Sequence, residues 1–136
     1  MKVKQLDHLN LTVNNFKETA EWYKRVFGFE VVEKGTYQDR PWGVLRSDDA
    51  MLCIYESPNK IHPNDSNDEF KKFHSVHHFG FRILDRGGWE QVVERENIEV
   101  LYGEAYRWPH SHSWYIKDLN GYDIEVVLWD GDLISF

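Results

Sequence analysis

The same alternation of apolar and polar positions occurs in two segments of this chain. Residues 8–13 read His-Leu-Asn-Leu-Thr-Val, and residues 78–83 read His-Phe-Gly-Phe-Arg-Ile. In both segments apolar residues recur at alternate positions after a histidine, which predicts a strand with one buried face. The segments start about half a chain length apart, so we expect an internal duplication. The alternative is two unrelated halves that match by chance.

A helix is expected after each of these strands. In the first half, Asn14 and Asn15 provide a helix N-cap, apolar residues follow at helical spacing, and Gly28 provides the C-terminal stop. In the second half, a helix begins after Asp85 and ends near Asn97. Its apolar face consists of Trp89, Val92 and Val93.

Three further strands are expected after each helix. They span residues 29–35, 42–47 and 50–56 in the first half, and 99–106, 112–117 and 122–129 in the second. The fold class is therefore α+β, with two tandem strand–helix–strands modules in a single domain over 1–136. Module one covers about 1–58 and module two about 75–129. The stretch of about 57–74 is rich in Pro, Asn, Asp and Ser and reads as a linker or a lid loop.

Strand alternation predicts which side chains lie on the face away from the helices. His8, His78 and Glu125 fall on that face of three different strands. Two imidazoles and one carboxylate suit a divalent ion such as iron(II), manganese, zinc or nickel. Three protein ligands leave positions open for water and substrate. The alternative for Glu125 is a plain surface carboxylate.

The turn before the last strand predicts a neighbour for Glu125. Residues 118–122 read as a three-residue hairpin loop with Gly121 in the left-handed position. This pairing places Tyr115 opposite Glu125, whereas a slip of one residue would place Trp114 there instead. Asn10 and Tyr115 are suitable hydrogen-bonding neighbours of a metal-bound ligand.

Composition and charge exclude several classes of partner. The net charge is −7 and the chain has no run of basic residues, so we expect no binding to nucleic acid or to an anionic membrane. Cys53 is the sole cysteine, which fits a reducing compartment. The N-terminus lacks the apolar stretch of a signal peptide, and no apolar run is long enough to span a bilayer. We therefore expect a cytoplasmic protein.

The chain resembles the vicinal oxygen chelate superfamily, which includes glyoxalase I, fosfomycin-resistance proteins, bleomycin-resistance proteins and extradiol dioxygenases. The resemblance rests on the order and spacing of four motifs. They are Asp7-His8-Leu9-Asn10-Leu11-Thr12-Val13, Trp22-Tyr23-Lys24-Arg25-Val26-Phe27-Gly28-Phe29, His78-Phe79-Gly80-Phe81 and Asp118-Leu119-Asn120-Gly121-Tyr122-Asp123-Ile124-Glu125. It implies paired βαβββ modules that form a curved mixed sheet around a metal cleft, often in a homodimer. It also implies His8, His78 and Glu125 as the metal ligands.

Departures from the family pattern bear on the reaction. Glyoxalase I-like members place a second Glu near the end of the first module, where this chain has Cys53, with Glu56 three residues on. We expect Cys53 to be a core residue and Glu56 to lie on the opposite face of the strand. A metal site with three protein ligands is therefore favoured over one with four. Asn10 stands where fosfomycin enzymes carry a threonine, and the tail after residue 128 is acidic, which argues against a phosphonate substrate.

The resemblance also suggests catalytic residues. Tyr115 lies ten residues before Glu125, where fosfomycin-modifying enzymes and extradiol dioxygenases carry a tyrosine that contacts the metal-bound substrate. Extradiol dioxygenases need a histidine as acid–base catalyst, and His112 or His110 is available, although both also fit an exposed loop.

We therefore expect a metal-dependent enzyme that acts on a small, oxygen-rich, metal-chelating substrate. Dioxygenase, lyase or isomerase, and thiol-transferase chemistry remain open, and Tyr115, Asn10 and His112 are the expected catalytic residues. The alternative is a non-catalytic protein that sequesters a drug or metabolite, as bleomycin-resistance proteins do. Retention of all three ligands disfavours this alternative.

Overall fold

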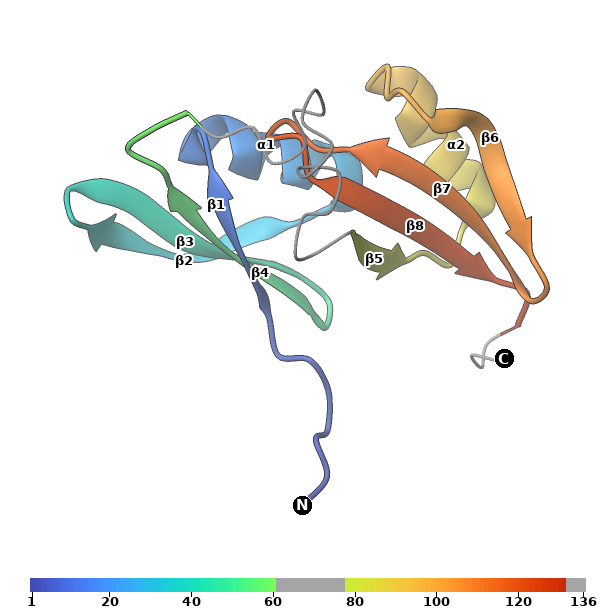
Figure 1. Ribbon diagram of the computed structural model, residues 1–136, viewed down its shortest axis with the longest axis horizontal. Coiled ribbons are helices and arrows are strands. Elements are labelled where there is room, and N and C mark those ends of the chain that lie inside the picture. The colour runs from blue at the N-terminus through green and yellow to red at the C-terminus, as the bar shows by residue number, and fades with distance from the viewer. Residues whose placement is uncertain (61–77, 132–136) are drawn as a thin grey trace, which may run out of the picture. The chain divides into compact units, whose positions relative to one another are not determined.

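A computed structural model describes residues 1–60 and 78–131 of the chain (Figure 1). The chain divides into two compact units, Met1–Ile61 and His62–Phe136. The expected linker, about 57–74, lies largely outside the described residues. Each unit contains a strand, a helix and three further strands in that order. The α+β class and the two tandem βαβββ modules are therefore confirmed.

Unit 1 forms a four-stranded sheet with the order β1-β4-β3-β2. The outer strand β1 runs parallel to β4, and the other neighbours are antiparallel. The helix α1 packs against β2, β3 and β4. The elements are β1 (Leu9–Val13), α1 (Phe16–Phe27), β2 (Glu30–Tyr37), β3 (Arg40–Ser47) and β4 (Ala50–Glu56).

Unit 2 repeats this topology with the strand order β5-β8-β7-β6. Again the first strand is parallel to the last, and the remaining pairs are antiparallel. The same order in both halves is the structural form of the repeat in the sequence. The elements are β5 (Phe79–Arg82), α2 (Arg86–Arg95), β6 (Leu101–Trp108), β7 (Ser111–Lys117) and β8 (Asp123–Trp129).

The two helices begin where the sequence predicts, but their caps differ. Asn15 Oδ1 accepts a hydrogen bond from the backbone N–H of Glu18 at 2.9 Å, and Gly28 ends α1 in the left-handed region with φ 70°. Asp85 precedes α2 without a side-chain cap bond. This helix ends at Arg95, before the expected Asn97, whose own φ of 50° breaks the helical path.

The β2–β3 hairpin and strand β6 differ from their expected bounds. The β2–β3 hairpin is longer than expected since Gln38 and Asp39, with φ of 50° and 61°, form a tight turn without glycine. Strand β6 starts and ends later than expected. Its pairing with β7 jumps from Leu101 to Tyr106, so β6 bulges between these two residues.

In both sheets the face toward the helix is apolar and the opposite face, called here the open face, is mixed. Alternation along β1 buries Leu11 and Val13 and leaves Asn10 and Thr12 exposed. The buried apolar positions of unit 2 are Trp89, Trp114, Ile116, Ile124 and Val126. Over the described ranges, neither helix has the length and apolar character to cross a membrane.

Candidate metal centre

The open face of unit 2 brings His78 and Glu125 together. His78 directly precedes β5, and Glu125 lies on the neighbouring strand β8, where it pairs with Gly80. The Nε2 atom of His78 lies 3.1 Å from Oε2 of Glu125. Their side chains are 33% and 19% exposed, so both are screened from bulk water but accessible.

Tyr115 occupies the position beside Glu125 that the hairpin loop predicts. The backbone N–H of Asp118 donates to the carbonyl of Tyr122 at 3.0 Å, and Gly121 has a φ of 88°. This turn sets the register in which Tyr115 pairs directly with Glu125, so the alternative slip to Trp114 does not occur. The Tyr115 hydroxyl donates to Oε1 of Glu125 at 3.1 Å.

Burial raises the pKa of Tyr115 above its ordinary value of 10, and the negative charge and hydrogen bond of Glu125 raise it further. A hydrogen bond from the Trp108 side chain opposes this shift. The phenol therefore keeps its proton through the neutral range. Tyr115 is a hydrogen-bond donor held beside two groups that can bind a metal ion.

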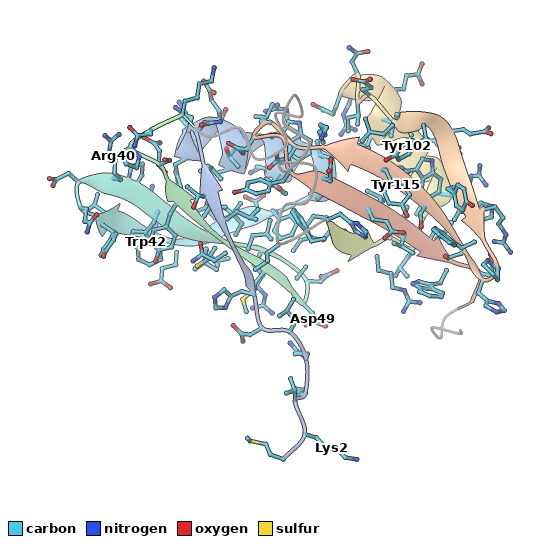
Figure 2. All side chains as sticks on the ribbon, viewed as in Figure 1. Lys2, Arg40, Trp42, Asp49, Tyr102 and Tyr115 are labelled. Atoms are coloured by element: carbon cyan, nitrogen blue, oxygen red, sulfur yellow. The ribbon has the colours of Figure 1, made fainter. Side chains whose placement is uncertain are left out.

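Two aromatic neighbours of Tyr115 are not expected from the sequence. The ring of Tyr102 lies 5.8 Å from that of Tyr115 in an edge-on contact, and Trp108 reaches the Tyr115 hydroxyl. The labels in Figure 2 mark Tyr102 and Tyr115. The Gly103 that follows Tyr102 was the available signal, because glycine within a strand pattern marks a bulge.

In unit 1, His8 holds the place equivalent to that of His78, directly before the first strand. The Nδ1 atom of His8 lies 2.8 Å from Oδ1 of the adjacent Asp7. When Nδ1 donates its proton to a carboxylate, the lone pair lies on Nε2 and can bind a metal ion. This is the usual arrangement of a metal-ligating histidine. Asn10 is exposed on β1, on the same face of that strand as His8.

Cys53 and Glu56 lie on opposite faces of β4. Cys53 pairs with Asn10 on the open face, whereas Glu56 Oε2 accepts a hydrogen bond from the backbone N–H of Phe16 at 2.8 Å. Glu56 thus caps the start of α1, on the helix side of the sheet. Burial, and then the charge of Glu33, raise the pKa of the Cys53 thiol.

The structure does not bring His112 to Tyr115 and Glu125. His112 lies three residues before Tyr115 on β7, and an odd interval turns the side chain to the other face. There its Nδ1 lies 3.2 Å from Nη1 of Arg107, and it lines a hollow beside α2 with Arg86. His112 therefore lies on the face of β7 opposite to Tyr115, and its role as an acid–base catalyst stays a prediction.

The donor atoms in unit 2 fit a divalent ion. Two ligands each about 2.1 Å from one ion, at a right angle, are about 3.0 Å apart. The 3.1 Å between His78 Nε2 and Glu125 Oε2 matches this spacing, although it is also that of an ordinary hydrogen bond. Within residues 1–60 and 78–131, no three His, Cys, Asp or Glu side chains cluster as a metal site.

Comparison with known proteins identifies the family. The sequence profile of the Glyoxalase/Bleomycin resistance protein/Dioxygenase superfamily matches residues 5–126. The chain belongs to this superfamily. No curated protein sequence matches the chain significantly.

Solved structures of other proteins share the fold. A glyoxylase/bleomycin resistance protein/dioxygenase domain from Frankia sp. EAN1pec has a TM-score of 0.76 at 11% identity, covering 97% of this chain and 96% of the other. A glyoxalase family protein from Enterococcus faecalis gives 0.71 at 16% identity, over 91% and 97% of the two chains. Lactoylglutathione lyase from Agrobacterium tumefaciens gives 0.66 at 24% identity, over 94% and 96%.

Proposed function

We propose that this protein is a divalent-metal-dependent enzyme that acts on a small, oxygen-rich substrate able to chelate the metal. His8, His78 and Glu125 are the proposed ligands. The observation that carries the proposal is the contact of Glu125 with two groups at once, His78 on one oxygen and Tyr115 on the other. The Glu125 side chain is also only 19% exposed, which supports a ligand role over that of a plain surface carboxylate.

Each residue has a distinct proposed role. His78 and Glu125 bind the ion from unit 2, and His8 supplies the third ligand through Nε2, with its ring oriented by Asp7. Tyr115 keeps a proton at its hydroxyl and, when substrate binds, donates its hydrogen bond to a negative oxygen of the substrate in place of Glu125. Asn10 is a second polar contact for the substrate.

A bound divalent ion would polarise a substrate oxygen and stabilise negative charge on it. The ligand set alone fits iron(II), manganese, zinc or nickel. Dioxygenase, lyase or isomerase, and thiol-transferase chemistry are all compatible with two histidines, one carboxylate and a neighbouring tyrosine. The lyase named among the similar structures shares the fold, and its reaction is one of those to be assayed.

A second candidate function is sequestration of a small molecule without turnover. It is favoured by the aromatic rings around Tyr115, since aromatic side chains also line binding pockets of non-catalytic proteins. Asn10→Ala separates the two functions. An enzyme should lose rate in this variant, whereas a sequestering protein should lose only affinity.

The metal site is tested by elemental analysis of the purified protein after incubation with iron(II), manganese, nickel and zinc. We expect about one ion per chain in the wild type and its loss in His78→Ala and Glu125→Ala, since each removes one of three ligands. Asp123→Asn is the matched control, because Asp123 lies on the same face of β8 and pairs with Lys117 at 2.7 Å. Wild-type protein that takes up none of the four ions would rule out the proposal.

We also propose a homodimer in the cytoplasm, as the family resemblance and the single cysteine indicate. Light scattering coupled to size-exclusion chromatography measures the mass of the particle directly. A mass of about 16 kDa, that of a single chain, would show a monomer and contradict this part of the proposal.

A further inference from the structure

Ser113 carries a buried hydroxyl that has no hydrogen-bond partner among the described residues. The residue is 0% exposed. It lies on the open face of β7, two residues before Tyr115. A buried polar group without a partner costs about 1–3 kcal/mol, so a serine at such a position requires a reason other than stability.

Two aromatic side chains of β6 lie beside this hydroxyl. Tyr106 is the direct cross-strand partner of Ser113, and its ring lies 4.7 Å from that of Trp108. Trp108 pairs with Ser111, the next residue of β7 on the same face as Ser113, and its side chain also interacts with the hydroxyl of Tyr115. Tyr106 and Trp108 are 54% and 44% exposed, so they can move without opening the core.

On the other side of Ser113, the paired residues of β8 and β5 end in the positive charge of Arg82. Val127 pairs with Ser113, and Arg82 pairs with Val127, which places these residues in one row across the sheet. Arg82 is exposed and donates to the carbonyl of Gly131 at 3.3 Å. The row therefore offers a hydroxyl and a guanidinium. Both donate hydrogen bonds, which suits an anionic oxygen group.

We propose that Ser113 and Arg82 form a subsite for a carboxylate or similar anionic oxygen group, and that Tyr106 and Trp108 are the cover that moves aside when this group binds. The subsite lies in the row next to Tyr115 and Glu125. It rests on the proposed function in one respect: the bound group belongs to the small molecule whose other end reaches these two residues. Ser113 then exchanges an unsatisfied hydroxyl for a hydrogen bond to the ligand.

The first part of the test is thermal unfolding of Ser113→Ala in the full chain. Removing an unpaired buried hydroxyl should leave the midpoint unchanged or raise it by about 2–4 °C. Ser111→Ala is the matched control, because Ser111 is buried on the same face of the same strand. A midpoint that falls by several degrees in Ser113→Ala would show that the hydroxyl has a structural partner, and would overturn the proposal.

The second part is binding of lactate to chelator-treated protein, followed through the indole N–H signals of the tryptophans by nuclear magnetic resonance. Lactamide is the uncharged probe. We expect lactate to shift the Trp108 signal, lactamide to bind at least about 5-fold more weakly, and Ser113→Ala to weaken lactate binding at least about 5-fold, the loss of one hydrogen bond. Ser111→Ala should bind lactate as the wild type does.

Any of three results overturns the subsite: no binding of lactate, equal binding of lactamide, or unchanged binding in Ser113→Ala. Because the probes are tested without metal, failure of the metal site does not affect this measurement. Metal content of Ser113→Ala should equal that of the wild type, which keeps failure of the subsite distinct from failure of the proposed function.

Discussion

Cys53 occupies in unit 1 the position that Glu125 occupies in unit 2. Each lies on the strand parallel to the first strand of its unit, opposite the residue two places after the first-strand histidine, Asn10 in one case and Gly80 in the other. The duplicated fold therefore has two equivalent positions, of which one carries a carboxylate and the other a thiol. The two halves of the chain are equivalent in topology but not in chemistry.

This relationship predicts that the Cys53 thiol is unreactive. Because burial and the charge of Glu33 raise the pKa of Cys53, little thiolate forms near neutral pH, and the thiolate is the reactive species. Alkylation by iodoacetamide at pH 7.5, followed by mass spectrometry, should be slower than for a free cysteine. Glu33→Gln should accelerate it.

Glu30→Gln is the control, because Glu30 pairs with Lys24 on the surface at 2.9 Å and should leave the rate unchanged. Cys53→Ser should also retain the metal if three residues, and not four, bind it. Loss of the metal in Cys53→Ser would contradict the three-ligand site.

Tyr115→Phe is predicted to separate metal binding from turnover. The hydroxyl contacts Glu125 but is not a proposed ligand, so metal content should stay intact. Loss of one donor to a negative oxygen should reduce turnover by about 10²-fold. The substrates to assay are catechols under oxygen, the hemithioacetal of glutathione, and fosfomycin with a thiol.

Tyr37→Phe is the control for this assay, because Tyr37 is an exposed tyrosine of unit 1. If the wild-type protein binds one of the substrates but consumes none with any metal, the sequestering function is favoured. An unchanged rate in Tyr115→Phe would remove Tyr115 from the mechanism.

The pH dependence of Tyr115 follows from its raised pKa. Stability tied to a pKa that is higher in the folded state is present below the unfolded pKa and is lost as the pH rises through the folded value. The free energy of unfolding should therefore fall more steeply above about pH 10 in the wild type than in Tyr115→Phe. Urea unfolding at a series of alkaline pH values measures this difference.

Glu125→Gln tests the cause of that shift. It removes the negative charge beside the phenol, so the pKa of Tyr115 should move down toward the ordinary value. Titration of carbon-13-labelled tyrosine by nuclear magnetic resonance, with Tyr115→Phe to assign the signal, follows the phenol directly. No movement would mean that burial alone sets the pKa.

The N-terminus of α1 is predicted to depend on two side chains. Asn15→Ala removes the cap bond to Glu18, and Glu56→Gln weakens the bond to the backbone of Phe16. Each should lower the free energy of unfolding by about 1 kcal/mol, as measured by urea unfolding. Asp85→Ala is the matched control on α2, where no side-chain cap bond exists, and a loss equal to that of Asn15→Ala would contradict the capping argument.

The sequence by itself determined the elements and the faces of this protein. Alternation and helical spacing are local properties of the backbone, so they were sufficient to predict the repeated strand–helix–strands order. The hairpin at Gly121 favoured the pairing of Tyr115 with Glu125, but only the structure excluded the slip of one residue that would place Trp114 there. The face of β4 on which Glu56 lies also followed from alternation, because Glu56 is an odd number of residues from Cys53.

Tertiary structure decided what each side chain on those faces meets. The contact of His78 with Glu125 depends on a parallel pairing of strands about 45 residues apart, and no local rule fixes that distance. Tyr102, which contacts the ring of Tyr115, lies within the bulge of β6, and a pattern of alternation does not reveal this bulge. The buried hydroxyl of Ser113 is likewise visible only after packing, since burial is a sum over neighbours distant in sequence.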